Sequence, residues 1–160
     1  MGLQGERGRE EIAMTDVAAT DGQAGRFITF EGGEGSGKST QIKLLCETLE
    51  ERGLAVARTR EPGGTPGAEA IRDLLVQGDT ARWDAESEGL LHYAARRDHV
   101  ERMVRPALAA GAWVVSDRFA DSTMAYQGYA HGLGRAWVEA LHDLVLGNFK
   151  PDLTVILDVP

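Results

Sequence analysis

Short apolar runs alternate with amphipathic stretches along the chain from Arg26 onward. The apolar runs predict strands at 26–31, 54–59, 113–116 and 153–157. The amphipathic stretches predict helices at about 38–52, 67–77, 86–110 and 135–147. Strands that alternate with helices favour parallel pairing, and continuous apolar runs are typical of strands buried on both faces. We therefore predict an α/β fold with three layers, in which helices flank a central parallel sheet.

Residues 1–25 differ from the rest of the chain. They are rich in glycine and in small or charged residues, and they show no periodic apolar face. We therefore predict a disordered N-terminal tail, within which Met14 is an alternative start. Residues 26–160 are then long enough to form one domain with its own core.

Charge and composition narrow the possible partners. The chain has 17 basic and 25 acidic residues, a net charge of −8, which argues against a broad nucleic-acid-binding surface. An anionic ligand must then be held by a few arginines and backbone amides. No apolar run reaches the roughly 18 residues of a membrane span, and no signal peptide is evident, so we expect a soluble cytoplasmic protein. The single cysteine, Cys46, fits a buried core position better than a reactive thiol.

The strongest chemical signal follows the first predicted strand. Residues 32–39 form a Gly-x-x-x-x-Gly-Lys-Ser loop, which is typical of polyphosphate binding, whereas the alternative is a glycine-rich surface turn. Its glycines allow successive backbone N–H groups to face phosphate oxygens at the start of a helix. We predict that Lys38 reaches the β- and γ-phosphates and that Ser39 binds Mg²⁺. The predicted nucleotide-binding residues are Gly32, Gly33, Glu34, Gly35, Ser36, Gly37, Lys38, Ser39 and Thr40.

Two further segments carry polar groups near the predicted edge of the sheet. Arg60–Thr65 contains a Pro-Gly-Gly turn that presents backbone amides beside an arginine, although a simple strand-to-helix turn is the alternative. His92, Arg96 and His99 have the spacing of one helix face. That face either meets a ligand or is a solvated charged surface.

A third segment follows the third predicted strand. Asp117 is placed to hold the hydration shell of Mg²⁺ or to fix an arginine, and Arg118 is placed to clamp an acceptor phosphate. Thr123, Tyr126 and Gln127 supply a hydroxyl, a ring and an amide, which suit a flat base with donors and acceptors. The alternative is an ordinary strand-to-helix connection with a capped helix.

Together these segments resemble the bacterial thymidylate kinases, P-loop kinases that transfer a phosphoryl group from ATP to dTMP. The resemblance spans 26–160 and rests on Phe30–Gln41, Arg60–Thr65, Asp117–Phe119, Ser122–Gln127 and Pro151–Asp158. It implies a P-loop NTPase fold in which four of five expected strands are present. It also implies a domain that is incomplete at its C-terminus, because the family continues into an arginine-bearing lid, a fifth strand and a terminal helix.

The resemblance implies roles for the polyphosphate loop and the phosphate-binding arginines. Glu34 stands where the family uses an acid to contact the 3′-hydroxyl of the acceptor sugar and to assist the metal. Arg96 and Arg118 match arginines that hold the dTMP phosphate. Lys38, Arg118 and Glu34 are therefore the expected catalytic residues, and Ser39 and Asp117 the expected metal-binding residues.

The resemblance also assigns the base and sugar contacts. Pro62 lies against the base, Thr123 reads the thymine edge, and Tyr126 crowds the 2′ position of the sugar. Gln127 belongs to the same substrate-binding set. His92 departs from the family pattern, which usually places an aromatic ring there to stack on thymine.

The expected function is Mg²⁺-dependent phosphorylation of dTMP by ATP in dTTP biosynthesis, by a homodimer for which helix 86–110 is a candidate interface. Two alternatives remain at this point. One is another P-loop nucleoside monophosphate kinase, and the other is a nucleotide-binding fragment whose catalysis is impaired because it lacks the lid.

Overall fold

The computed structural model describes residues 24–79 and 82–158. Most of the predicted tail at 1–25 lies outside these residues. Gly25, at its end, packs closely against the segment before the third strand. A Cβ on Gly25 would lie 2.5 Å from the carbonyl oxygen of Ala112 and 2.8 Å from that of Leu108, so only glycine fits there.

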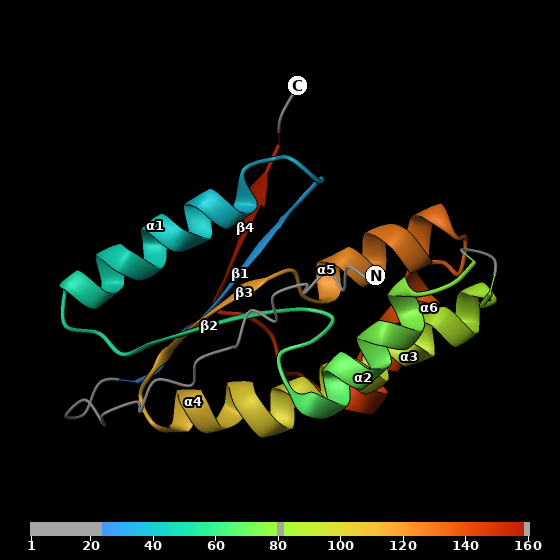
Figure 1. Ribbon diagram of the computed structural model, residues 1–160. Coiled ribbons are helices and arrows are strands. Elements are labelled where there is room, and N and C mark those ends of the chain that lie inside the picture. Colours follow the sequence, from blue (N-terminus) through green and yellow to red (C-terminus); the bar gives the residue numbers. More distant parts are fainter. Residues whose placement is uncertain (1–23, 80–81, 159–160) are drawn as a thin grey trace, which may run out of the picture.

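All four predicted strands are present and pair in parallel. They are β1 (Phe27–Gly32), β2 (Val56–Arg60), β3 (Trp113–Asp117) and β4 (Leu153–Leu157), in the order β2-β3-β1-β4 (Figure 1). Asp117 at the end of β3 is level with Phe30 on one side and with Arg60 on the other. The loops that follow β1, β2 and β3 therefore leave the sheet side by side, at the edge where open α/β sheets place their ligands.

The helices agree with the prediction except at one place. Their bounds are α1 (Lys38–Glu51), α2 (Pro66–Val76), α3 (Ala85–His99), η1 (Val100–Val104), α4 (Arg105–Ala109), α5 (Ala120–Thr123), η2 (Met124–Ala130) and α6 (Arg135–Leu146). The predicted helix at 86–110 corresponds to α3, η1 and α4 in succession, with η1 wound as a π-helix. The helical segment formed by α5 and η2 was not predicted. Within the described residues, no helix combines the length and apolarity needed to cross a bilayer.

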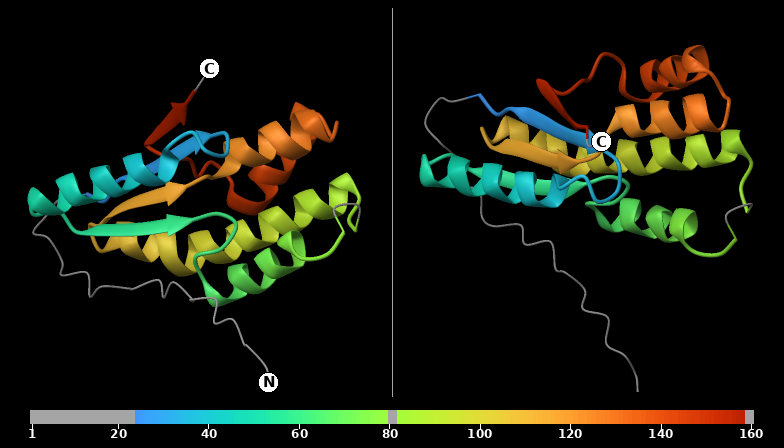
Figure 2. Two further views of the ribbon diagram at one scale, coloured as in Figure 1. Left: turned by 45° about the horizontal axis from the view of Figure 1, so that its top comes forward. Right: turned by 90° about the horizontal axis from the view of Figure 1, so that it is seen from above.

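Side chains from alternate positions of the strands build a core on each face of the sheet. On one face, Ile28 and Phe30 of β1 pack with the apolar side of α1, which includes the buried Cys46. On the other face, Phe27 of β1 packs with η1 and with Leu146 of α6. Figures 1 and 2 show α1 on one side of the sheet and the layer containing α3 and α4 on the other. The predicted three-layer α/β architecture is therefore confirmed.

Candidate active site

The loop between β1 and α1 has the backbone that its glycines allow. Gly32, Gly35 and Gly37 have φ values of 140°, 75° and 86°, which L side chains rarely adopt. Gly32 also approaches β4 so closely that a Cβ would lie 2.5 Å from the carbonyl oxygen of Leu157. A residue with a side chain at position 32 would therefore displace either the loop or β4.

Lys38 lies across this loop and is buried. Its Nζ donates to the carbonyl oxygens of Gly32 at 2.9 Å and Gly33 at 2.8 Å. A cavity of about 510 Å³ opens beside the loop. Its lining consists of Glu34, Gly35, Ser36, Gly37, Lys38, Ser39, Thr40, Asp117 and Arg118. The structure thus brings most of the predicted nucleotide-binding residues together with both residues predicted at the end of β3.

We call the cavity beside the glycine-rich loop the phosphate cavity. Two of its oxygen atoms lack hydrogen-bond partners among the described residues. Ser36 Oγ and Asp117 Oδ1 are buried, and neither forms a hydrogen bond within the described residues. A buried polar group without a partner costs about 1–3 kcal/mol, so such atoms are typical of a site that a ligand completes. A carboxylate oxygen beside a phosphate-binding loop suits Mg²⁺, which prefers oxygen ligands and retains waters.

A second cavity, of about 330 Å³, lies next to the first, between the loop after β2, α3 and the α5–η2 segment. It is lined by Glu61, Pro62, Glu88, His92, Arg96, Arg118, Phe119, Ser122, Thr123, Tyr126, Gln127 and His131. Every predicted substrate-binding residue is in this acceptor cavity except Glu34, which lines the phosphate cavity. His92 and Arg96 therefore face a cavity, and the alternative of a solvated helix face is wrong for these two residues.

Arg118 lines both cavities. Its φ of 72° is the only positive value at a non-glycine position in the described part of the chain. Its Nη1 donates to Ser122 Oγ at 3.1 Å, and its guanidinium lies 5.6 Å from the centre of the Tyr126 ring. Backbone strain of this kind gathers at functional sites, where the surrounding structure maintains it.

Glu31, which was not predicted, anchors the segment after β3. Its carboxylate is buried and accepts hydrogen bonds from the Phe119 backbone N–H at 2.7 Å and from Ser122 Oγ at 2.6 Å. Burial raises the pKa of Glu31 in spite of these bonds. Glu31 and Ser122 therefore form a chain of contacts that orients Arg118.

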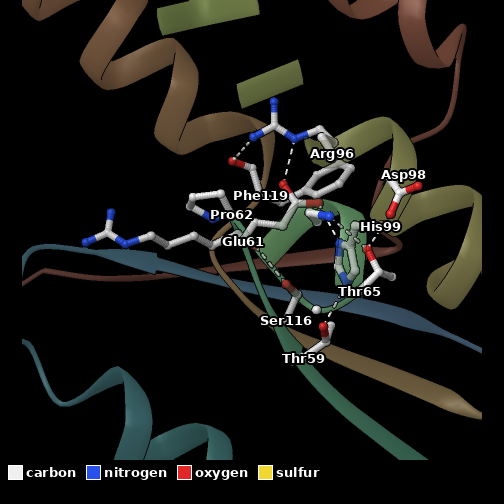
Figure 3. A network of polar contacts seen from close by, with 12 residues as sticks. Thr59, Glu61, Pro62, Thr65, Arg96, Asp98, His99, Ser116 and Phe119 are labelled. Atoms are coloured by element: carbon white, nitrogen blue, oxygen red, sulfur yellow. Dashed lines mark hydrogen bonds and ion pairs between the residues drawn. The ribbon is translucent and has the colours of Figure 1, made fainter. Parts of the chain in front are cut away.

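Arg96 is held in a buried network that leaves one NH2 group, Nη1, without a partner among the described residues (Figure 3). Its Nε donates to Glu61 Oε2 at 2.7 Å, and its Nη2 donates to the Phe119 carbonyl and to Thr123 Oγ1, both at 3.0 Å. Nη1 is buried and forms no hydrogen bond within the described residues. Arg96 thus lies beside Thr123 in the wall of the acceptor cavity, and its Nη1 has no hydrogen-bond partner among the described residues.

Glu61 joins this arginine to a buried histidine. The other oxygen of Glu61 lies 2.8 Å from His99 Nδ1, and His99 Nε2 lies 2.7 Å from Thr59 Oγ1 (Figure 3). Burial alone would raise the pKa of Glu61, but the charge of Arg96 and the contact with His99 outweigh it and lower the pKa. No local sequence signal identified Glu61 or Thr59, because their partners come from α3.

His92 and Glu88 line the acceptor cavity on α3 together with Arg96. Burial, reinforced by the nearby charge of Arg96, lowers the pKa of His92 to about 4, so the ring is neutral near pH 7. Glu88 accepts a hydrogen bond from Gln127 Nε2 at 2.9 Å and lies 3.4 Å from His131 Nδ1. An ionised carboxylate only accepts, so the amino group of Gln127 faces Glu88 and its carbonyl oxygen remains for a ligand.

Arg60, the arginine beside the Pro-Gly-Gly turn, stabilises the loop after β2. Its Nη2 contacts both carboxylate oxygens of Glu69 at 3.2 Å, and Glu69 also accepts from the Gly64 backbone N–H at 2.9 Å. These contacts favour a structural role over a phosphate contact.

Comparisons with known proteins identify the family. The family model described as thymidylate kinase matches residues 30–160. The thymidylate kinases of Rhizorhabdus wittichii and Caulobacter vibrioides are 58% and 59% identical over 136 residues, which cover 85% of this chain and 65% of each relative. The chain thus spans about 65% of the length of these curated relatives. A crystal structure of thymidylate kinase from Ehrlichia chaffeensis superposes with a TM-score of 0.79 at 44% identity, covering 86% of this chain and 78% of that one. The chain belongs to the thymidylate kinase family.

Proposed function

We propose that this chain binds ATP and dTMP and transfers the γ-phosphoryl group of ATP to dTMP, forming ADP and dTDP on the route to dTTP. The observation that carries the proposal is the meeting of two cavities at Arg118. One is bounded by the glycine-rich loop and Lys38, and suits a polyphosphate. The other gathers the ring, hydroxyl and amide groups that suit a nucleoside monophosphate.

The proposed reaction is an in-line displacement. An oxygen of the dTMP phosphate attacks the γ-phosphorus of ATP, the bond from that phosphorus to the β–γ bridging oxygen breaks, and ADP leaves. The attacking oxygen is already ionised near pH 7, so no general base is required. Lys38 and Arg118 supply positive charge where the transferring group develops negative charge, and the two cavities fix the reactants in position.

Ser39 and the unpartnered Oδ1 of Asp117 would hold Mg²⁺ together with the phosphates of ATP. When bound, the ion would neutralise charge on the β- and γ-phosphates. Glu34 lines the same cavity, from which we propose that it contacts the sugar of the acceptor nucleotide.

Within the acceptor cavity we assign opposite ends to the two arginines. Arg118 binds the dTMP phosphate, because it also borders the cavity of the phosphoryl donor. The sequence resemblance places Arg96 on the phosphate as well, but its contact with Thr123 and its pairing with Glu61 favour the base end. There the free Nη1 donates to a carbonyl oxygen of thymine, while Gln127 presents its own carbonyl oxygen to the imide N–H.

We also propose a cytoplasmic homodimer. Leu90 on α3 is 52% exposed and Leu144 on α6 is 83% exposed, and apolar side chains of this size at a surface are available for contact with a second copy. Sedimentation of the purified chain measures the oligomeric state directly, and a monomer at all concentrations would contradict this part of the proposal.

A kinase assay with ATP, Mg²⁺ and separate dTMP, dUMP, UMP, CMP, AMP and GMP tests the function. We expect turnover with dTMP above all others.

We also expect the Lys38→Ala variant to lose turnover by at least about a hundredfold, because the donor phosphates lose their charge-assisted contact. Lys43→Ala is the matched control, since Lys43 pairs with Glu47 on the exposed side of α1. Preference for another nucleotide, or normal activity of Lys38→Ala, would overturn the proposal.

A further inference from the structure

We propose that His99, with Thr59, is a positioning residue for the acceptor nucleotide. The inference rests on the proposed function, because it concerns how the dTMP site is held in shape. His99 is fully buried at the last residue of α3, where the helix passes into the π-helical turn η1. It lies behind the acceptor cavity and does not line it.

His99 acts on the cavity through Glu61. One oxygen of the Glu61 carboxylate contacts His99 Nδ1 at 2.8 Å and the other contacts Arg96 Nε at 2.7 Å. A carboxylate held at both oxygens cannot rotate, and it fixes the plane of the guanidinium that it pairs with. The orientation of the Arg96 guanidinium, and with it the position of the unpartnered Nη1, therefore depends on the contact between His99 and Glu61.

Thr59 holds the second nitrogen of the His99 imidazole. The ionised Glu61 is an acceptor, so Nδ1 of His99 carries the hydrogen of that bond. Nε2 lies 2.7 Å from the hydroxyl of Thr59, which can act as donor or acceptor, so both ring nitrogens have a hydrogen-bond partner. The imidazole is therefore held at both nitrogens, by Glu61 on one side and by Thr59 on the other.

His99 also supports the loop that carries Pro62. Gly64 lies against the ring so closely that a Cβ would be 2.7 Å from His99 Cδ2 and 2.8 Å from His99 Nε2. The same Cβ would be 2.5 Å from Thr59 Oγ1. The His99–Thr59 pair is therefore the surface on which the loop after β2 rests, and it places two walls of the acceptor cavity at once.

The simpler interpretation is that His99 only fills the core. A core-filling role predicts that an apolar ring of similar size changes stability alone. A positioning role predicts a selective loss of affinity for dTMP, because Glu61 loses one of its two donors and Arg96 loses its fixed orientation.

Calorimetric titration of the full chain with dTMP, and separately with a non-hydrolysable ATP analogue, distinguishes the two roles. For His99→Phe we expect the Kd for dTMP to rise about tenfold, as for loss of a hydrogen bond to a charged group, with the Kd for the ATP analogue unchanged. His99→Asn, whose amide nitrogen can replace Nδ1, should recover part of the affinity. Thr59→Val, which removes only the hydroxyl, should weaken dTMP binding about threefold.

His142→Phe is the matched control. His142 is a partly buried histidine that also has two hydrogen-bond contacts, to the Tyr93 hydroxyl and the Phe149 carbonyl, and it does not line the acceptor cavity. Its variant should bind dTMP like the wild type.

If His99→Phe fails to fold, Thr59→Val and His99→Asn decide the question. Wild-type affinity for dTMP in the His99 and Thr59 variants, or equal weakening toward both ligands, would overturn the positioning role alone. A wild-type chain that does not bind dTMP would overturn the proposed function, and this inference with it.

Discussion

Arg96 is the residue at which the geometry adds most to the sequence assignment. Three of its contacts go to protein atoms, and its charge is balanced by a buried carboxylate. A guanidinium whose charge is already paired acts on a ligand through the direction of its remaining NH2 group more than through net charge. That property suits a base carbonyl, whereas Arg118 keeps its charge available at the border of the phosphate cavity.

The two arginines can be separated by comparing dTMP with thymidine, which lacks the phosphate. Arg96→Lys retains the positive charge beside Glu61 but loses the free Nη1, so it should weaken both ligands by about tenfold. Arg118→Met should weaken the binding of dTMP strongly and the binding of thymidine little. Titration calorimetry measures all four changes. A loss confined to dTMP in Arg96→Lys would place Arg96 at the phosphate instead.

His92 gives the fold a specific dependence on pH. Its pKa is about 4 in the folded chain against an ordinary value of 6.5, so between these values the unfolded chain binds more protons. The stability that comes from the neutral ring is complete above pH 6.5 and is lost as the pH falls toward 4. The loss amounts to about 3 kcal/mol at most. Urea unfolding at pH 7 and pH 4.5 should show a smaller loss for His92→Phe than for the wild type, and parallel losses would contradict this account.

The residues that line the two cavities were largely predictable, but those that hold them in place were not. The glycine-rich loop and the polar run after β3 are contiguous, so their chemistry is visible in a short window. Glu31 meets Phe119 across 88 positions, and Glu61 meets His99 across 38. The role of a buried polar side chain depends on partners that are distant in sequence and come close only when the chain folds. The sequence alone does not show that pairing.

At the level of elements, apolar periodicity predicted the segments that bury aliphatic side chains and missed the one that does not. The four strands and the helices that cover them bury aliphatic side chains, and each left a pattern. The segment formed by α5 and η2 instead buries Thr123, Gln127 and Gly128, so it has no apolar stripe. A helix whose inner face forms a binding site is polar on that face, and periodicity does not detect it.

The start of α2 offers a test at this scale. Thr65 caps the helix by accepting from the Ala68 backbone N–H at 3.2 Å, and its hydroxyl donates to Asp98 on α3. Thr65→Val keeps the shape but removes both bonds, and should lower the free energy of unfolding by about 1–2 kcal/mol. Thr65→Ser keeps the hydroxyl and should stay close to the wild type. Urea unfolding of the three proteins checks this, and equal stability of the Val and Ser variants would refute the capping role.

At the scale of the whole fold, β4 is an edge strand of the sheet formed by the described residues. Leu153 and Ile156 of this strand are 53% and 69% exposed, and an apolar edge strand is a template for pairing with another chain. Ile156→Lys should therefore reduce concentration-dependent light scattering. Leu44→Lys, at a position 51% exposed on α1, makes the same chemical change away from the edge and should have little effect. Equal effects of the two substitutions would argue against edge pairing.

The position of Arg118 on the wall of both cavities has a consequence for equilibrium binding. A ligand in either cavity changes the electrostatic potential at the Arg118 guanidinium and restricts the conformations of this side chain. The two sites therefore have a coupling free energy. Thermodynamic linkage requires that coupling to be reciprocal: the factor by which an ATP analogue changes the Kd of dTMP equals the factor by which dTMP changes the Kd of the analogue. We therefore expect substitution of Arg118 to reduce the coupling between the binding of the ATP analogue and that of dTMP.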